Sequence, residues 1–156
     1  MQRQLKKEVK IGNLKIGGTN PIAVQTMLNV PVKDIAGNVE QAKRVAKAGC
    51  QIVRVTVPTP ADAAVVSAIK EAVDIPVSVK LSYEASNFNG FTSSLEEAGV
   101  SGVTAIDALK GLMGVDLEHH RALMPTYGGY SGQYIRPIAL ATIATLKQTT
   151  GFPICG

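Results

Sequence analysis

The sequence has 156 residues and a net charge of +4, and this length is typical of one domain with one core. Hydrophobic residues make up 46% and charged residues 18% of the chain, a composition that excludes an intrinsically disordered protein. No apolar segment approaches the roughly 18 residues of a membrane span, and no apolar signal segment follows the N-terminus. We therefore expect a soluble domain in the cytoplasm, with no membrane partner.

The charges and the cysteines exclude further kinds of site. Basic residues gather mainly in residues 2–10 and are otherwise scattered, which favours a solvated face over nucleic-acid binding. Cys50 and Cys155 are far apart and form no CxxC pair. This spacing argues against a disulfide framework and against a cysteine-based zinc or iron–sulfur site. We expect no metal and no iron–sulfur cluster within this chain.

The predicted elements begin with a β-hairpin within residues 1–20, where Gly12 and Asn13 supply the turn. Aliphatic runs of strand length then follow at residues 21–27, 52–57, 76–81, 103–108 and 152–155. Helical patterns with apolar faces lie between most of them, at residues 34–48, 59–73, 91–99 and 137–149. The chain therefore alternates strand and helix.

This alternation implies parallel strands, which an open doubly wound sheet and a (β/α)8 barrel would both provide. No GxGxxG follows the first strand, which weakens the dinucleotide-binding version of the open sheet. A closed barrel needs eight units and typically about 250 residues, whereas about five strands are predicted here and the last stops at Gly156. We expect an α/β fold, a partial TIM barrel that forms one incomplete domain over residues 1–156.

Polar side chains interrupt the strands on one face. Alternation places Arg54 and Thr56 on the face opposite the valines of their strand, and Ser78 and Lys80 on the same face of the next. A buried cation is costly unless a negative group pairs with it. Arg54 and Lys80 therefore indicate an anionic ligand; in the alternative, Asp107 near the end of the following strand neutralises Lys80.

Residues 126–140 read TYGGYSGQYIRPIAL and join a glycine-rich loop to the start of a helix. Gly128, Gly129 and Gly132 would let backbone N–H groups turn toward a phosphate or the polar edge of a ring. An ordinary turn is the alternative. His119 and His120 lack a third metal ligand nearby and are interpreted as solvated, and Leu112, Met113 and Val115 are interpreted as packing residues in the segment before this loop.

Residues 76–82 and 99–156 resemble the FMN domain of dihydropyrimidine dehydrogenase and, more loosely, dihydroorotate dehydrogenase. The resemblance rests on PVSVKLS, GVSGVTAIDALKGLMGVDLE, TYGGYSGQYIRPIAL and GFPICG. It implies an FMN-linked oxidoreductase of pyrimidine metabolism. The residues implied to bind the cofactor are Lys80, Asp107, Gly128, Gly129 and Ser131. Asp107 stands where the family has asparagine, the loop RVTVPTP lacks the family's catalytic cysteine, and no catalytic residue is assigned.

Residues 8–60 resemble a second family, 4-hydroxy-3-methylbut-2-enyl diphosphate synthase of isoprenoid biosynthesis. VKIGNLKIGGTNPIAVQTMLN and NVEQAKRVAKAGCQIVRVTVP carry the resemblance, which implies that Arg54 contacts the substrate diphosphate. In that family a further, C-terminal domain carries the cysteine ligands of a 4Fe–4S cluster, and we expect this chain to lack that domain.

Three functional hypotheses follow, and whether the chain is an enzyme stays open among them. The leading one is an incomplete FMN-linked oxidoreductase module, the second is a diphosphate-binding barrel of the isoprenoid type, and the third is a non-catalytic barrel fragment. The first two would act on a small-molecule substrate. An open sheet with apolar edges also predicts self-association or a missing C-terminal barrel segment.

Overall fold

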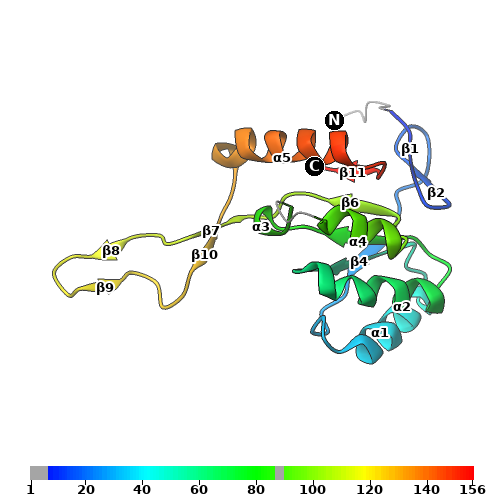
Figure 1. The fold of residues 1–156 in the computed structure, drawn as a ribbon, viewed down its shortest axis with the longest axis horizontal. Helices are drawn as coiled ribbons and strands as arrows, with labels where there is room; N and C mark the ends of the chain where they lie inside the picture. The colour runs from blue at the N-terminus through cyan, green and yellow to red at the C-terminus, as the bar shows by residue number, and fades with distance from the viewer. Residues whose placement is uncertain (1–6, 87–89) are drawn as a thin grey trace.

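The computed structural model describes residues 7–86 and 90–156. Within these residues, five parallel strands form one sheet in the order β11-β6-β5-β4-β3 (Figure 1). The strands are β3 Gln25–Met27, β4 Ile52–Thr56, β5 Val77–Lys80, β6 Gly102–Thr104 and β11 Ile154–Cys155. The predicted α/β class with a parallel sheet is confirmed. The sheet is open, with β3 and β11 at its edges, so closure into a barrel is not observed among the described residues.

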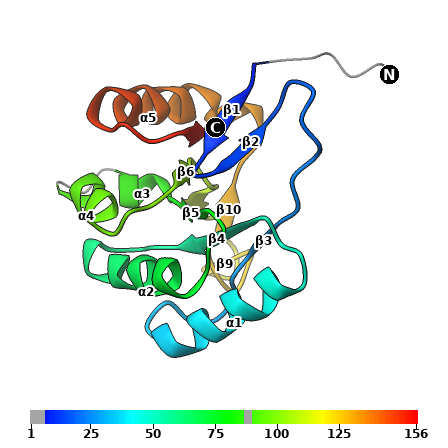
Figure 2. The same ribbon diagram turned by 90° about the vertical axis from the view of Figure 1, so that its right-hand side faces the viewer.

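Helices follow the strands and lie beside one another along the sheet (Figure 2). The α-helices are α1 Ile35–Lys47, α2 Ala64–Ala72, α3 Tyr83–Ser86, α4 Phe91–Glu97 and α5 Arg136–Thr149, and the 3-10 helices are η1 Pro60–Ala63 and η2 Gln133–Ile135. None of the helices in the described ranges has both the length and the apolar character needed to cross a membrane.

The core lies between the sheet and these helices. One face of β4 and β5, continued by the residue that follows each strand, is fully buried, because every second residue points toward the helices. Burial of each such side chain contributes about 1.5–3 kcal/mol. The residues on this face are Val53, Val55, Val57, Val77, Val79 and Leu81.

The helix starts have the local chemistry that the sequence predicts. The Asp34 side chain caps α1 by accepting the N–H of Gly37 at 2.9 Å. Asp62 lies in η1, directly before α2, where it accepts a hydrogen bond from Thr59 and forms an ion pair with Lys33. Because Lys33 precedes α1, this ion pair ties together the connections that follow β3 and β4.

The N-terminal hairpin closes the amino-terminal end of the sheet. β1 Val9–Ile11 and β2 Leu14–Ile16 pair antiparallel, and Gly12 turns the chain with a φ of +58°. A Cβ at Gly12 would lie 3.1 Å from Pro76 Cγ and 3.5 Å from Ser101 Oγ. Since these residues directly precede β5 and β6, the turn packs against the amino ends of both strands.

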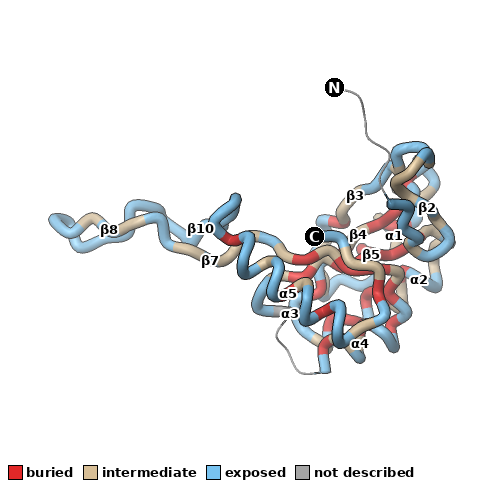
Figure 3. Tube along the Cα trace, turned by 90° about the horizontal axis from the view of Figure 1, so that it is seen from above, coloured by how far each residue is buried: buried red, intermediate tan, exposed pale blue. Residues whose placement is uncertain are grey.

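A long two-stranded ribbon leaves the carboxyl end of the sheet after β6 and projects away from the body (Figures 1 and 3). β7 Leu109–Gly111 pairs with β10 Gly128–Tyr130, and β8 Val115–Asp116 pairs with β9 Arg121–Ala122. The interpretation of Leu112, Met113 and Val115 as packing residues is wrong, because all three are exposed. A two-stranded ribbon standing apart from the sheet has no second layer against which they could pack.

Candidate functional site

The second face of the sheet carries the polar side chains that the sequence singles out. Strand pairing places Arg54 beside Ser78 in one row. The next row toward the carboxyl ends joins Lys80 to Thr56 on one side and to Thr104 on the other, and Thr104 pairs with Cys155 of β11. Thr104 and Cys155 are not among the site residues that the sequence predicts. Alternation along β6 could have identified Thr104, because it places this residue on the face opposite the buried Val103.

A cavity of about 220 Å³ lies between this face and the N-terminal hairpin. Ile11 and Ile16 of the hairpin contribute apolar walls, while Arg54, Ser78 and Thr104 contribute polar groups from the sheet. The cavity therefore combines apolar walls with a cationic side chain, which suits a small ligand with an anionic group.

Arg54 is partly buried, and its Nε atom is buried without a hydrogen-bond partner among the described residues. A buried donor that stays unpaired costs about 1–3 kcal/mol, and more when the group is charged. An anion bound at Arg54 would remove this cost. Its backbone carbonyl is already used, since it accepts the N–H of Leu28 at 2.8 Å.

Lys80 has an acidic partner. Its Nζ lies 2.9 Å from Oδ2 of Asp107, which follows β6 at the carboxyl end of the sheet. The hydrogen bond from Lys80 holds the pKa of Asp107 below its ordinary value, and the positive charges of Lys80 and Arg54 act in the same direction. The structure thus shows the neutralised arrangement of Lys80 that the sequence leaves as an alternative.

The glycine-rich loop lies on the exposed ribbon. Gly128 and Gly129 belong to β10 and pair with Gly111 and Lys110 of β7, and Ser131 is exposed. A Cβ at Gly128 would meet nothing within 4 Å, so this part of the loop faces open space. Gly129, by contrast, packs against Ala108, the neighbour of Asp107 in the sequence.

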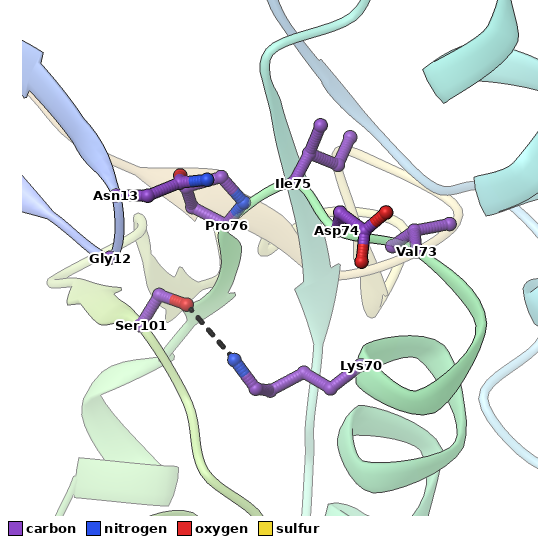
Figure 4. Close-up of a pocket in the computed structure, with 8 residues that line it drawn as sticks. All are labelled: Gly12, Asn13, Lys70, Val73, Asp74, Ile75, Pro76 and Ser101. Atoms are coloured by element: carbon purple, nitrogen blue, oxygen red, sulfur yellow. Dashed lines mark hydrogen bonds between the residues drawn. The ribbon is translucent and has the colours of Figure 1, made fainter.

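A second pocket, of about 320 Å³, lies at the amino-terminal end of the sheet, beside the hairpin turn at Gly12 and Asn13 (Figure 4). Lys70 and Asp74 contribute charged groups there, and Lys70 Nζ lies 3.5 Å from Ser101 Oγ, which also accepts the N–H of Val77 at 3.2 Å. The amino-terminal end of a parallel barrel sheet usually serves stability, whereas chemistry is placed at the carboxyl end. We therefore interpret this pocket as the junction of hairpin and sheet.

The two histidines lie on the ribbon, and both are exposed. His119 Nδ1 lies 2.9 Å from Oδ2 of Asp116, which also accepts the Arg121 Nε–H at 3.3 Å. Across residues 7–86 and 90–156, no group of three or more His, Cys, Asp and Glu side chains is placed to hold a metal ion.

The open parallel sheet with flanking helices is consistent with part of a TIM-barrel domain. Residues 6–103, more than half of the chain, match the family model described as the GcpE TIM-barrel domain. The chain belongs to this family, as the resemblance of residues 8–60 predicts.

Curated relatives support this assignment, and all three described here are named 4-hydroxy-3-methylbut-2-en-1-yl diphosphate synthase (flavodoxin). The Caldanaerobacter subterraneus relative is 44% identical over 82 residues, which cover 53% of this chain and 23% of the relative. The Leptospira interrogans relative is 50% identical over 62 residues, which cover 40% of this chain and 9% of the relative. The Nitratidesulfovibrio vulgaris relative is 35% identical over 100 residues, which cover 64% of this chain and 25% of the relative. The matched part spans a quarter or less of the relatives' own length.

The prediction of FMN as a cofactor is wrong. The family model and these relatives belong to the diphosphate synthase type, and neither supports the resemblance of residues 99–156 to an FMN domain. The geometry gives a physical reason, because Gly128 and Ser131 are exposed on the ribbon and form no cradle above Lys80. The leading hypothesis of an FMN-linked oxidoreductase of pyrimidine metabolism is therefore replaced by the second hypothesis.

The iron–sulfur cluster that the resemblance assigns to a further domain does not fit the residues of this chain. The sequence contains two cysteines, of which Cys50 is buried beside the backbone of Ile52 and Cys155 is exposed on β11. Two cysteines without further thiolates nearby do not supply the usual ligand set of such a cluster.

Proposed function

We propose that this chain forms the diphosphate-binding part of a barrel of the 4-hydroxy-3-methylbut-2-enyl diphosphate synthase type, which acts in isoprenoid biosynthesis. Membership of the GcpE family supports the class. The observation that carries the site is Arg54, a cation on the polar face of the sheet whose buried Nε has no hydrogen-bond partner within residues 7–86 and 90–156. A phosphate oxygen would accept that hydrogen and balance the charge.

Two neighbouring side chains can add contacts to the bound phosphate group. Ser78 lies beside Arg54, and its hydroxyl can donate to the same phosphate group. Lys80, one row nearer the carboxyl end, can add a second positive charge. Together these groups bind and orient an organic diphosphate without themselves making or breaking a bond. In the complete enzyme, flavodoxin is the proposed electron partner, since the names of the relatives include it.

Thermal denaturation with inorganic diphosphate tests this function. At a concentration of one hundred times Kd, a ligand stabilises the folded state by about 2.7 kcal/mol, which corresponds to a rise in Tm of roughly 5–10 °C for a chain of this size. We expect this rise for the wild type and its loss in Arg54→Ala. Arg44→Ala is the matched control, because Arg44 is exposed on α1.

The proposal is wrong if Arg54→Ala is stabilised as much as the wild type. If diphosphate stabilises none of these proteins, the non-catalytic barrel fragment becomes the better account.

A further inference from the structure

We propose that Asp107 is a built-in competitor for the anion site, so that a phosphate group binds Lys80 only by displacing the Asp107 carboxylate. The inference rests on the proposed function, because it concerns the same cationic face. It assigns to Asp107 the role of setting the affinity of the site, not of contacting the ligand.

The positions of the two partners decide which of them can leave. Lys80 belongs to the central strand β5, and its side chain is 24% exposed. Asp107 lies on the connection between β6 and the ribbon, and its side chain is 56% exposed. A carboxylate that is already half in water loses little solvation when it swings away, whereas Lys80 extends from the central strand and is much less exposed. Asp107 is therefore the mobile partner.

The Asp107 carboxylate also acts on the second cation. The positive charge of Arg54 contributes to holding the pKa of Asp107 below its ordinary value, so the carboxylate lies within the field of both cations. Arg54 on β4 and Lys80 on the neighbouring strand β5 lie on the same face of the sheet, and Lys80 lies one row nearer the carboxyl ends of the strands. A phosphate between them would face repulsion from Asp107 until the carboxylate moved out.

Binding is thus an exchange of one anion for another. The carboxylate brings one negative charge to Lys80, whereas a diphosphate brings several and can contact Arg54 at the same time. The exchange favours the ligand, but breaking the internal pair lowers its apparent affinity. Removal of the Asp107 charge should raise the affinity, while removal of the Arg54 charge should lower it.

Isothermal titration calorimetry with inorganic diphosphate tests this inference on the wild type, Asp107→Asn and Asp107→Ala. Breaking an exposed ion pair typically costs up to about 1 kcal/mol, so both variants are expected to bind more tightly than the wild type, by up to about fivefold. Asp116→Asn is the matched control, because Asp116 also pairs with a cation, Arg121, but lies on the ribbon, and the affinity of this variant should equal that of the wild type. Agreement between the Asn and Ala variants excludes a new hydrogen bond from the asparagine amide as the cause.

The outcomes separate this inference from the proposed function. If the wild type binds and both Asp107 variants bind equally or more weakly, the competitor role is overturned and the diphosphate site stands. If the wild type fails to bind but the Asp107 variants bind, the competitor role is supported in its strongest form. If none of the proteins binds, both proposals are overturned. Circular dichroism of each variant confirms that the comparison is made between folded proteins.

Discussion

Gly129 of β10 packs directly against Ala108, so closely that a Cβ at position 129 would lie 2.7 Å from the Cβ of Ala108. Ala108 follows Asp107, the partner of Lys80. The base of the ribbon is therefore held against the residue next to the ion pair. Glycine is required at position 129 because of this close approach to Ala108.

Gly129→Val should destabilise the chain by about 1–3 kcal/mol, the usual cost of inserting atoms into a packed contact. Gly128→Val is the matched control, since a Cβ there meets nothing within 4 Å, and it should leave stability nearly unchanged. Chemical denaturation of both variants measures the difference. Equal stability of the two variants would show that the contact between Gly129 and Ala108 is absent in solution.

The ion pair between Asp62 and Lys33 predicts a pH dependence of stability. The hydrogen bond from Lys33 holds the pKa of the buried Asp62 below its ordinary value, and the hydrogen bond from Thr59 acts in the same direction. The ionised carboxylate therefore stabilises the fold above the unfolded-state pKa of about 3.9, and this contribution disappears as the pH falls through the lower folded-state pKa.

Asp62→Asn should consequently be less stable than the wild type at neutral pH, and the difference should shrink below about pH 4. Urea denaturation at a series of pH values measures this difference in the free energy of unfolding. A difference that stays constant down to pH 2 would mean that ionisation of Asp62 contributes nothing to folding.

Asn38 on α1 is fully buried, and its side chain forms hydrogen bonds with the connection that follows β3. Its Nδ2 donates to the carbonyl oxygens of Pro31 and Asp34, each at 2.9 Å. Asn38→Ala leaves both carbonyls without this donor and should cost about 1–3 kcal/mol. Lys47→Ala, an exposed change on the same helix, should cost much less. Thermal denaturation compares the two variants, and similar losses would argue against the predicted role of Asn38.

The exposed apolar side chains of the ribbon should cause self-association. Met113 and Leu117 both lie in water on this segment, which has no core of its own. Replacing both with serine should lower the apparent mass in light scattering at high concentration. Ile22→Ser, an equally exposed change near β3, should have little effect. A monomeric wild type at the same concentration would contradict the prediction.

Much of the body of the fold follows from local patterns. The alternation of valines with Arg54 and Ser78 predicts which face meets the helices, and the burial of Val53, Val55 and Val77 agrees with it. The acidic partner of Lys80 was also foreseeable, since Asp107 ends the next aliphatic run. These inferences succeed because strand periodicity and the cost of a buried charge are local properties.

The ribbon is not predicted by the sequence pattern, because its strands are only two or three residues long and most of their residues are exposed. Burial, the usual source of a strand's alternating pattern, is absent there. The mistaken FMN hypothesis has the same origin. Gly128 and Gly129 were interpreted as a ligand loop, whereas Gly129 makes room for Ala108 within an antiparallel pair.

The most direct test of the diphosphate site follows the Nε–H resonance of Arg54 by NMR during titration with inorganic diphosphate. Comparison with the spectrum of Arg54→Lys, which lacks this signal, assigns it. We expect the resonance to shift in a saturable way, because its donor has no hydrogen-bond partner among the residues that the structure describes and would gain a phosphate oxygen on binding. An Arg54 resonance that stays in place while diphosphate is added to excess would contradict the assignment of this chain as a diphosphate-binding barrel segment.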